Sequence, residues 1–112
     1  MAISPGLERF VVAQLERVGP ITAKRMFGAI GLYAGTSFFA LIDDDRLYFK
    51  VDDENRSDFE AAGMEPFRPY GDDRTMGYYE VPIDVLEDAD ALTAWARKAI
   101  AVAERAHRPK RR

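Results

Sequence analysis

The fold is decided by residues 21–52, which read ITAKRMFGAIGLYAGTSFFALIDDDRLYFKVD. Short runs rich in β-branched and aromatic residues alternate there with glycine and aspartate, which favour turns. The last run, RLYFKV, alternates in character, with Leu47 and Phe49 on one face and Tyr48 and Lys50 on the other. One buried face and one solvated face predict an antiparallel sheet that is covered on a single side.

Helical patterns flank this region. Ser4-Pro5 is typical of a helix start and Gly19-Pro20 of a helix end, with apolar residues at helical spacing between them. Asp90 is the expected cap of the final helix. The predicted elements are helices at 4–18, 53–62 and from 90 onward, a helical turn at 84–87, and strands at 22–27, 30–34, 37–43, 46–51 and 76–81.

The expected class is therefore α+β, with helices packed against an antiparallel sheet. The expected order is one helix, three or four strands, a helix, one or two strands, and a helix. With 112 residues and 47% apolar content, the chain fits one domain at 1–105 followed by a basic tail at 106–112. No signal peptide and no apolar run of about 18 residues is visible, so we expect a cytoplasmic protein without membrane contact.

Charge is distributed unevenly along the chain. The net charge is −3, but residues 105–112 hold five basic and no acidic side chains. The preceding 104 residues carry 11 basic against 19 acidic groups, a balance of −8. An acidic body does not match a groove-binding DNA domain. The tail is the candidate nucleic-acid contact, through phosphates, and its basic residues are Arg108, Lys110, Arg111 and Arg112.

The sequence offers no catalytic, metal-binding or cofactor-binding set. Cysteine is absent, and His107 is the only histidine, which excludes a serine triad and most zinc sites. The acidic runs at 43–45 and 52–54 bracket one predicted strand and lie about 20 Å apart, too far to share a metal ion. We therefore expect a protein that is not an enzyme; a small hydrolase or ligand-binding domain is the remaining alternative.

The glycine-rich segment GAIGLYAG at 28–35 does not match a nucleotide-binding loop. Its spacing fits neither the dinucleotide fingerprint nor the P-loop, and no helix is expected to begin there. Hairpin turns and close backbone contacts explain these glycines better.

Aromatic residues near lysine or arginine supply the candidate binding residues. Tyr48 lies on the polar face of its strand beside Lys50, a pattern typical of a protein interface or of a platform for stacking a base. A tyrosine that merely covers the sheet edge is the alternative. We take Arg25, Tyr48 and Lys50 as the candidate partner-binding set.

The middle of the chain resembles the TfoX N-terminal-domain family, which is found in bacterial competence regulators. The resemblance rests on RMFGAIGLY at 25–33, Gly35, FALI at 39–42, LYFKVD at 47–52, Phe59, Gly63, Pro66-Phe67, Tyr70, Tyr78-Tyr79, Pro82, Trp95 and Ala99. It implies an α+β fold without transferable catalytic residues or cofactor. It also implies a stand-alone version, because full-length competence regulators carry a second, C-terminal helical domain.

The resemblance favours a non-enzymatic module in transcription regulation that binds a protein partner. Family regulators are thought to act alongside other transcription factors rather than as sequence-specific DNA readers. Nucleic-acid contact through the basic tail is the alternative function. An open sheet edge also allows a homodimer.

Overall fold

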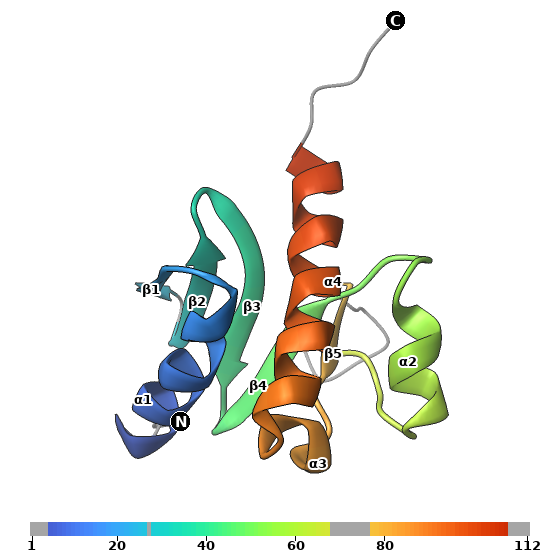
Figure 1. Cartoon of the computed structure of the whole chain (residues 1–112), viewed down its shortest axis with the longest axis horizontal. Helices are drawn as coiled ribbons and strands as arrows, with labels where there is room; N and C mark the ends of the chain where they lie inside the picture. Colours follow the sequence, from blue (N-terminus) through green and yellow to red (C-terminus); the bar gives the residue numbers. More distant parts are fainter. Residues whose placement is uncertain (1–4, 27, 68–76, 108–112) are drawn as a thin grey trace, which may run out of the picture.

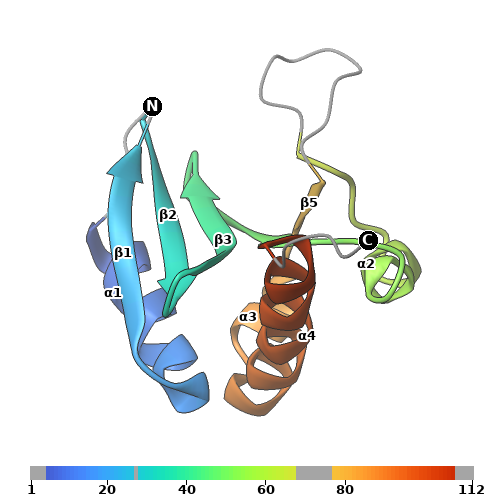
Figure 2. The same cartoon turned by 90° about the horizontal axis from the view of Figure 1, so that it is seen from above.

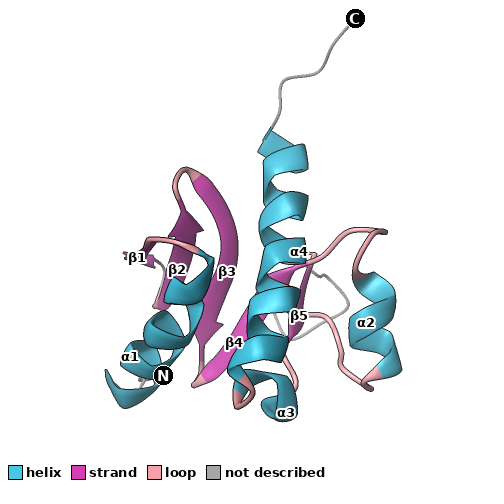
Figure 3. Cartoon of the chain, viewed as in Figure 1, coloured by secondary structure: helices cyan, strands magenta, loops and turns pink. Residues whose placement is uncertain are grey.

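The computed structural model describes residues 5–26, 28–67 and 77–107, and it confirms an α+β fold (Figures 1 and 3). The helices are α1 (Pro5–Leu15), a 3-10 turn (Glu16–Val18), α2 (Arg56–Ala61), α3 (Ile83–Leu86) and α4 (Ala89–His107). The strands are β1 (Ile21–Met26), β2 (Ala29–Ala34), β3 (Ser37–Asp43), β4 (Arg46–Lys50) and β5 (Tyr78–Glu80). The predicted Ser4 cap, the turn predicted at 71–73 and the start of the strand predicted at 76 lie outside the described residues.

The strands form one antiparallel sheet in the order β1-β2-β3-β4-β5, so neighbours in sequence are neighbours in space. Two-residue turns join β2 to β3 and β3 to β4. The second turn places Asp44 and Asp45 at φ 53° and 58°, the left-handed geometry of a type I′ hairpin. The glycine-rich segment at 28–35 forms turns and strand β2, as predicted, and no helix begins there.

Helices α1 and α4 cover one face of the sheet (Figures 1 and 2). The apolar faces of these helices pack on the sheet face that the alternating pattern of β4 predicted to be buried. Leu47 and Phe49 are 2% and 0% exposed there, and Val11 of α1 and Leu92 of α4 are fully buried in the same core cluster. The sheet is thus covered on the side that the sequence predicted. No helix in the described part of the chain is long and apolar enough to cross a membrane.

The starts of α4 and α2 differ from the prediction. The cap of α4 is Asp88 rather than Asp90, because the Asp88 carboxylate accepts the backbone N–H groups of Asp90 and Ala91 at 3.1 and 3.2 Å. Asp90 instead forms a 2.7 Å ion pair with Arg17. Helix α2 begins at Arg56 instead of residue 53, since residues 52–55 form a turn held by the Asn55 side chain.

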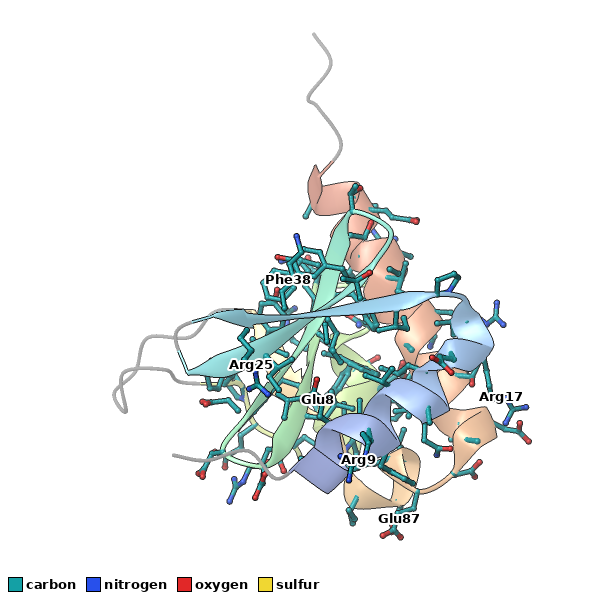
Figure 4. All side chains as sticks on the ribbon, turned by 90° about the vertical axis from the view of Figure 1, so that its left-hand side faces the viewer. Glu8, Arg9, Arg17, Arg25, Phe38 and Glu87 are labelled. Atoms are coloured by element: carbon teal, nitrogen blue, oxygen red, sulfur yellow. The ribbon has the colours of Figure 1, made fainter. Side chains whose placement is uncertain are left out.

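The two edges of the sheet are not equivalent. The outer edge of β5 is bonded to residues 65–67: the Phe67 N–H donates to the Tyr78 carbonyl at 2.6 Å. Strand β1 pairs with β2 alone and forms the opposite edge. It crosses the front of the molecule in Figure 4. Residues 22–25 of this strand are exposed.

Candidate interaction surface

The structure does not bring the predicted contact set together. Arg25 lies on the helix-covered side of the sheet, where its guanidinium is 3.6 Å from the Glu8 carboxylate of α1 (Figure 4). Tyr48 and Lys50 lie on the opposite face. Tyr48 is 9% exposed because the Phe67 ring packs on it at 4.6 Å. Of the three residues, only Lys50 keeps a partly accessible side chain on the face opposite the helices.

The face opposite α1 and α4, here called the outer face, carries a row of aromatic rings. Tyr33 and Phe38 are cross-strand neighbours whose rings stack at 5.1 Å with 20° between their planes. Phe38 in turn contacts Tyr78 at 5.7 Å. Two lysines approach these rings: the Lys24 ammonium on β1 is 5.1 Å from the Tyr33 ring centre, and the Lys50 ammonium on β4 is 5.0 Å from the Tyr78 ring centre on β5. Tyr33, Phe38 and Tyr78 with these two lysines are called the aromatic row.

The two lysines differ from most basic residues of the described chain. Each rests its ammonium on an aromatic ring, an attraction of about 0.5–1 kcal/mol at exposed sites that leaves the charge unneutralised. Elsewhere in the described residues, six basic side chains form ion pairs with carboxylates: Arg17, Arg25, Arg46, Arg56, Lys98 and Arg105. The aromatic row therefore concentrates free positive charge on the outer face.

Burial raises the pKa of two tyrosine hydroxyls on the outer face. Tyr78 is 3% exposed, and loss of solvent raises the pKa of its phenol to about 12, with a further contribution from Tyr33. Burial also raises the pKa of Tyr48, aided by the Glu80 carboxylate. Both phenols are therefore neutral at physiological pH, and neither is activated as a nucleophile.

Two hollows of opposite character lie toward the two ends of β4. The larger, about 470 Å³, is lined by Tyr48 and Phe67 and by Asp43, Asp44, Glu65 and Glu80 against one cation, Arg46. The smaller, about 300 Å³, is lined by Tyr33, Thr36, Phe38, Lys50, Ala103 and Ala106, and none of these described residues carries a carboxylate. Strand β4 runs from the acidic hollow at Arg46 to the basic hollow at Lys50. The surface is therefore polarised along this strand.

The described residues contain no group of three or more His, Asp or Glu side chains arranged to hold a metal ion. The predicted nucleic-acid contacts of the tail lie outside the described residues: Arg108, Lys110, Arg111 and Arg112.

Sequence reasoning missed Lys24 and Phe38. The sequence did contain a signal for the pairing of Phe38 with Tyr33. A two-residue turn at Gly35-Thr36 pairs Ala34 with Ser37 and hence Tyr33 with Phe38. The contact of Phe38 with Tyr78 had no such signal, since it joins residues 40 positions apart.

Comparison with known proteins identifies the class of domain. The TfoX N-terminal domain family matches residues 13–103, so the chain belongs to that family. One curated relative is a protein named "DNA transformation protein TfoX1" from Aliivibrio fischeri (strain ATCC 700601 / ES114), 33% identical over 54 residues. The alignment covers 48% of this chain and 26% of the relative, so the chain spans about a quarter of that protein's length.

Proposed function

We propose that this chain is a non-enzymatic regulatory domain that acts in the cytoplasm by binding a protein partner through the outer face of its sheet. Family membership and the relative's name support a regulatory role connected with DNA transformation. The observation that carries the proposal is the aromatic row. The stacked rings of Tyr33 and Phe38 lie between the strands that hold Lys24 and Lys50, and neither lysine forms an ion pair with a carboxylate in the described structure. Aromatic residues are enriched where proteins bind one another.

A protein partner fits the aromatic row better than a nucleic-acid strand does. A base stacks on a free ring face. Both faces of Tyr33 are occupied, since Phe38 approaches from β3 and Lys24 from β1.

The experiment is a comparison of transcripts in the native host. Strains carry the wild-type gene, a deletion, the double variant K24E/K50E, or R97E, which changes an exposed cation on α4 as a matched control. We expect the double variant to reproduce most of the deletion's transcript changes at normal protein level, and R97E to match the wild type. A double variant indistinguishable from the wild type contradicts the proposal.

A further inference from the structure

The basic hollow lies where three elements end together. Thr36 belongs to the β2–β3 turn, Lys50 is the last residue of β4, and Ala103 and Ala106 lie in the last turns of α4. Its walls are the ring of Phe38, the ring of Tyr33 and the two alanine methyl groups. A volume of about 300 Å³ is at the lower end of ligand pockets, so it suits one apolar side chain better than a whole cofactor.

The charge around this hollow favours an anion. Among the described residues that line it, the one Lys, Arg, Asp or Glu side chain is Lys50. The carboxylate of Asp52, two residues further along the chain, is held by Arg105 through contacts of 3.0–3.3 Å, which neutralise it. Lys24 offers a second cation on the same face, three strands away on β1 and displaced along the strands, because the register places Lys24 in line with Tyr48 rather than with Lys50.

The larger hollow, which is lined by acidic residues, limits where an anionic partner can lie. Four carboxylates line it against one arginine, so an acidic segment is repelled from the Arg46 end of β4. It is attracted to the Lys50 end. The polarity of the surface therefore restricts an acidic segment to a path from Lys50 toward Lys24 across the aromatic row.

We propose that the basic hollow binds an acidic segment of a partner protein, with one apolar side chain inserted between Phe38 and Ala106 and carboxylates placed on Lys50 and Lys24. This inference rests on the proposed function and specifies the chemistry of the partner.

A second copy of this chain is a weaker occupant. The chain does expose an apolar side chain next to a carboxylate, since Ile83 is 61% exposed beside Asp84 at the start of α3. Inserting Ile83 of one copy into the hollow of another is a head-to-tail contact. It leaves a free hollow at one end and a free Ile83 at the other end of every open assembly. Such contacts give open filaments unless the rotation closes a ring.

The test uses the full chain and a fluorescein-labelled peptide in which a leucine–phenylalanine pair is flanked on each side by three glutamates. Binding is measured by fluorescence anisotropy. We expect saturable binding. Lys50→Glu is expected to weaken it about tenfold, a loss of about 1.4 kcal/mol in binding free energy, because an attractive contact with the peptide becomes repulsive. Ala106→Trp, which fills the hollow from an exposed position, is expected to weaken binding by a similar factor.

Matched controls separate the hollow from general charge effects. Arg97→Glu removes an exposed cation and Ala94→Trp adds a large ring elsewhere on α4, and both are expected to bind within about twofold of the wild type. Thermal melting shows whether each variant is folded. The same peptide with glutamine in place of glutamate is expected not to bind.

Three results overturn the inference. The first is no binding of the acidic peptide, or binding that Ala106→Trp leaves unchanged. The second is binding of an oligothymidine strand that Lys50→Glu and Ala106→Trp both abolish. The third is self-association in sedimentation velocity that Ile83→Asp abolishes. If one of these occurs while K24E/K50E still alters transcripts in the host, the proposed function survives and only the partner chemistry is wrong.

Discussion

The buried amide of Asn55 is expected to control the stability of the structure that holds Lys50. Asn55 is 1% exposed. Its side-chain oxygen accepts the Asp52 N–H at 2.9 Å, and its side-chain nitrogen donates to the Lys50 carbonyl at 3.1 Å. This residue therefore joins the end of β4 to the turn that starts α2.

Replacing Asn55 with alanine removes two hydrogen bonds and leaves an N–H and a carbonyl without these partners. Each lost bond costs about 1 kcal/mol, and groups left buried without a partner cost more, so we expect the free energy of unfolding to fall by about 2–3 kcal/mol. Asn55→Asp keeps the acceptor for Asp52 but turns a carboxylate oxygen toward the Lys50 carbonyl. We expect it to be at least as destabilising, since the second carboxylate oxygen is then buried facing another acceptor.

The measurement is urea unfolding followed by the fluorescence of Trp95, which lies on α4 and meets Phe59 of α2 edge-on at 4.7 Å. Ser57→Ala, an exposed change on the same helix, is the control and is expected to stay within about 0.5 kcal/mol of the wild type. A loss below about 0.5 kcal/mol for Asn55→Ala would refute the assignment of these two hydrogen bonds.

Three further predictions concern the turn, the buried phenol and the tail. Asp44→Gly is expected to raise the free energy of unfolding by about 1 kcal/mol, because glycine adopts φ 53° without strain; a lower or unchanged melting temperature argues against it. The pKa of Tyr78 is raised to about 12 in the folded state, so its contribution to stability is complete below the unfolded value of about 10 and is lost as pH rises through 12. Urea unfolding between pH 9 and 12 is therefore expected to show a steeper loss for the wild type than for Tyr78→Phe, and equal slopes exclude this cause. DNA binding of the full chain, measured by anisotropy across a salt series, is expected to be weak and to disappear on truncation after His107, which removes Arg108, Lys110, Arg111 and Arg112; binding that survives truncation places the contact elsewhere.

Local patterns predicted the strands well. The alternation from Leu47 to Lys50 assigned each side chain to its face, because side chains alternate with a period of two wherever the backbone is extended. The turn chemistry of Asp43–Asp45 and the glycine at position 35 placed the hairpins for the same reason: both act over a few residues.

The candidate site was harder to predict because it depends on contacts between distant residues. Tyr48 was expected to be accessible, but Phe67, 19 positions later, covers its ring. Arg25 was grouped with Tyr48 and Lys50, yet the register of β1 against β2 places Arg25 opposite Ile30, on the helix-covered side. Spacing within one strand does not carry this information, whereas pairing across several strands does.

The N-terminal cap of α4 also could not be predicted from residue type alone. Asp88 and Asp90 are both suitable caps by residue type. The structure selects Asp88 because α4 begins one residue later, at Ala89, and Asp90 then pairs with Arg17 of the 3-10 turn. Packing of the first helical segment against α4 decided between two locally equivalent aspartates.

Photo-crosslinking in the native host tests most directly whether a protein binds the outer face. A photoreactive phenylalanine analogue replaces Thr36, an exposed lining residue of the basic hollow, or Glu87, an exposed control residue beside α3 (Figure 4). We predict a discrete protein adduct from position 36 that disappears in the K24E/K50E background, and no such adduct from position 87. Equal adducts from both positions, or an adduct at position 36 that K24E/K50E leaves unchanged, would contradict the assignment of the outer face as the binding surface.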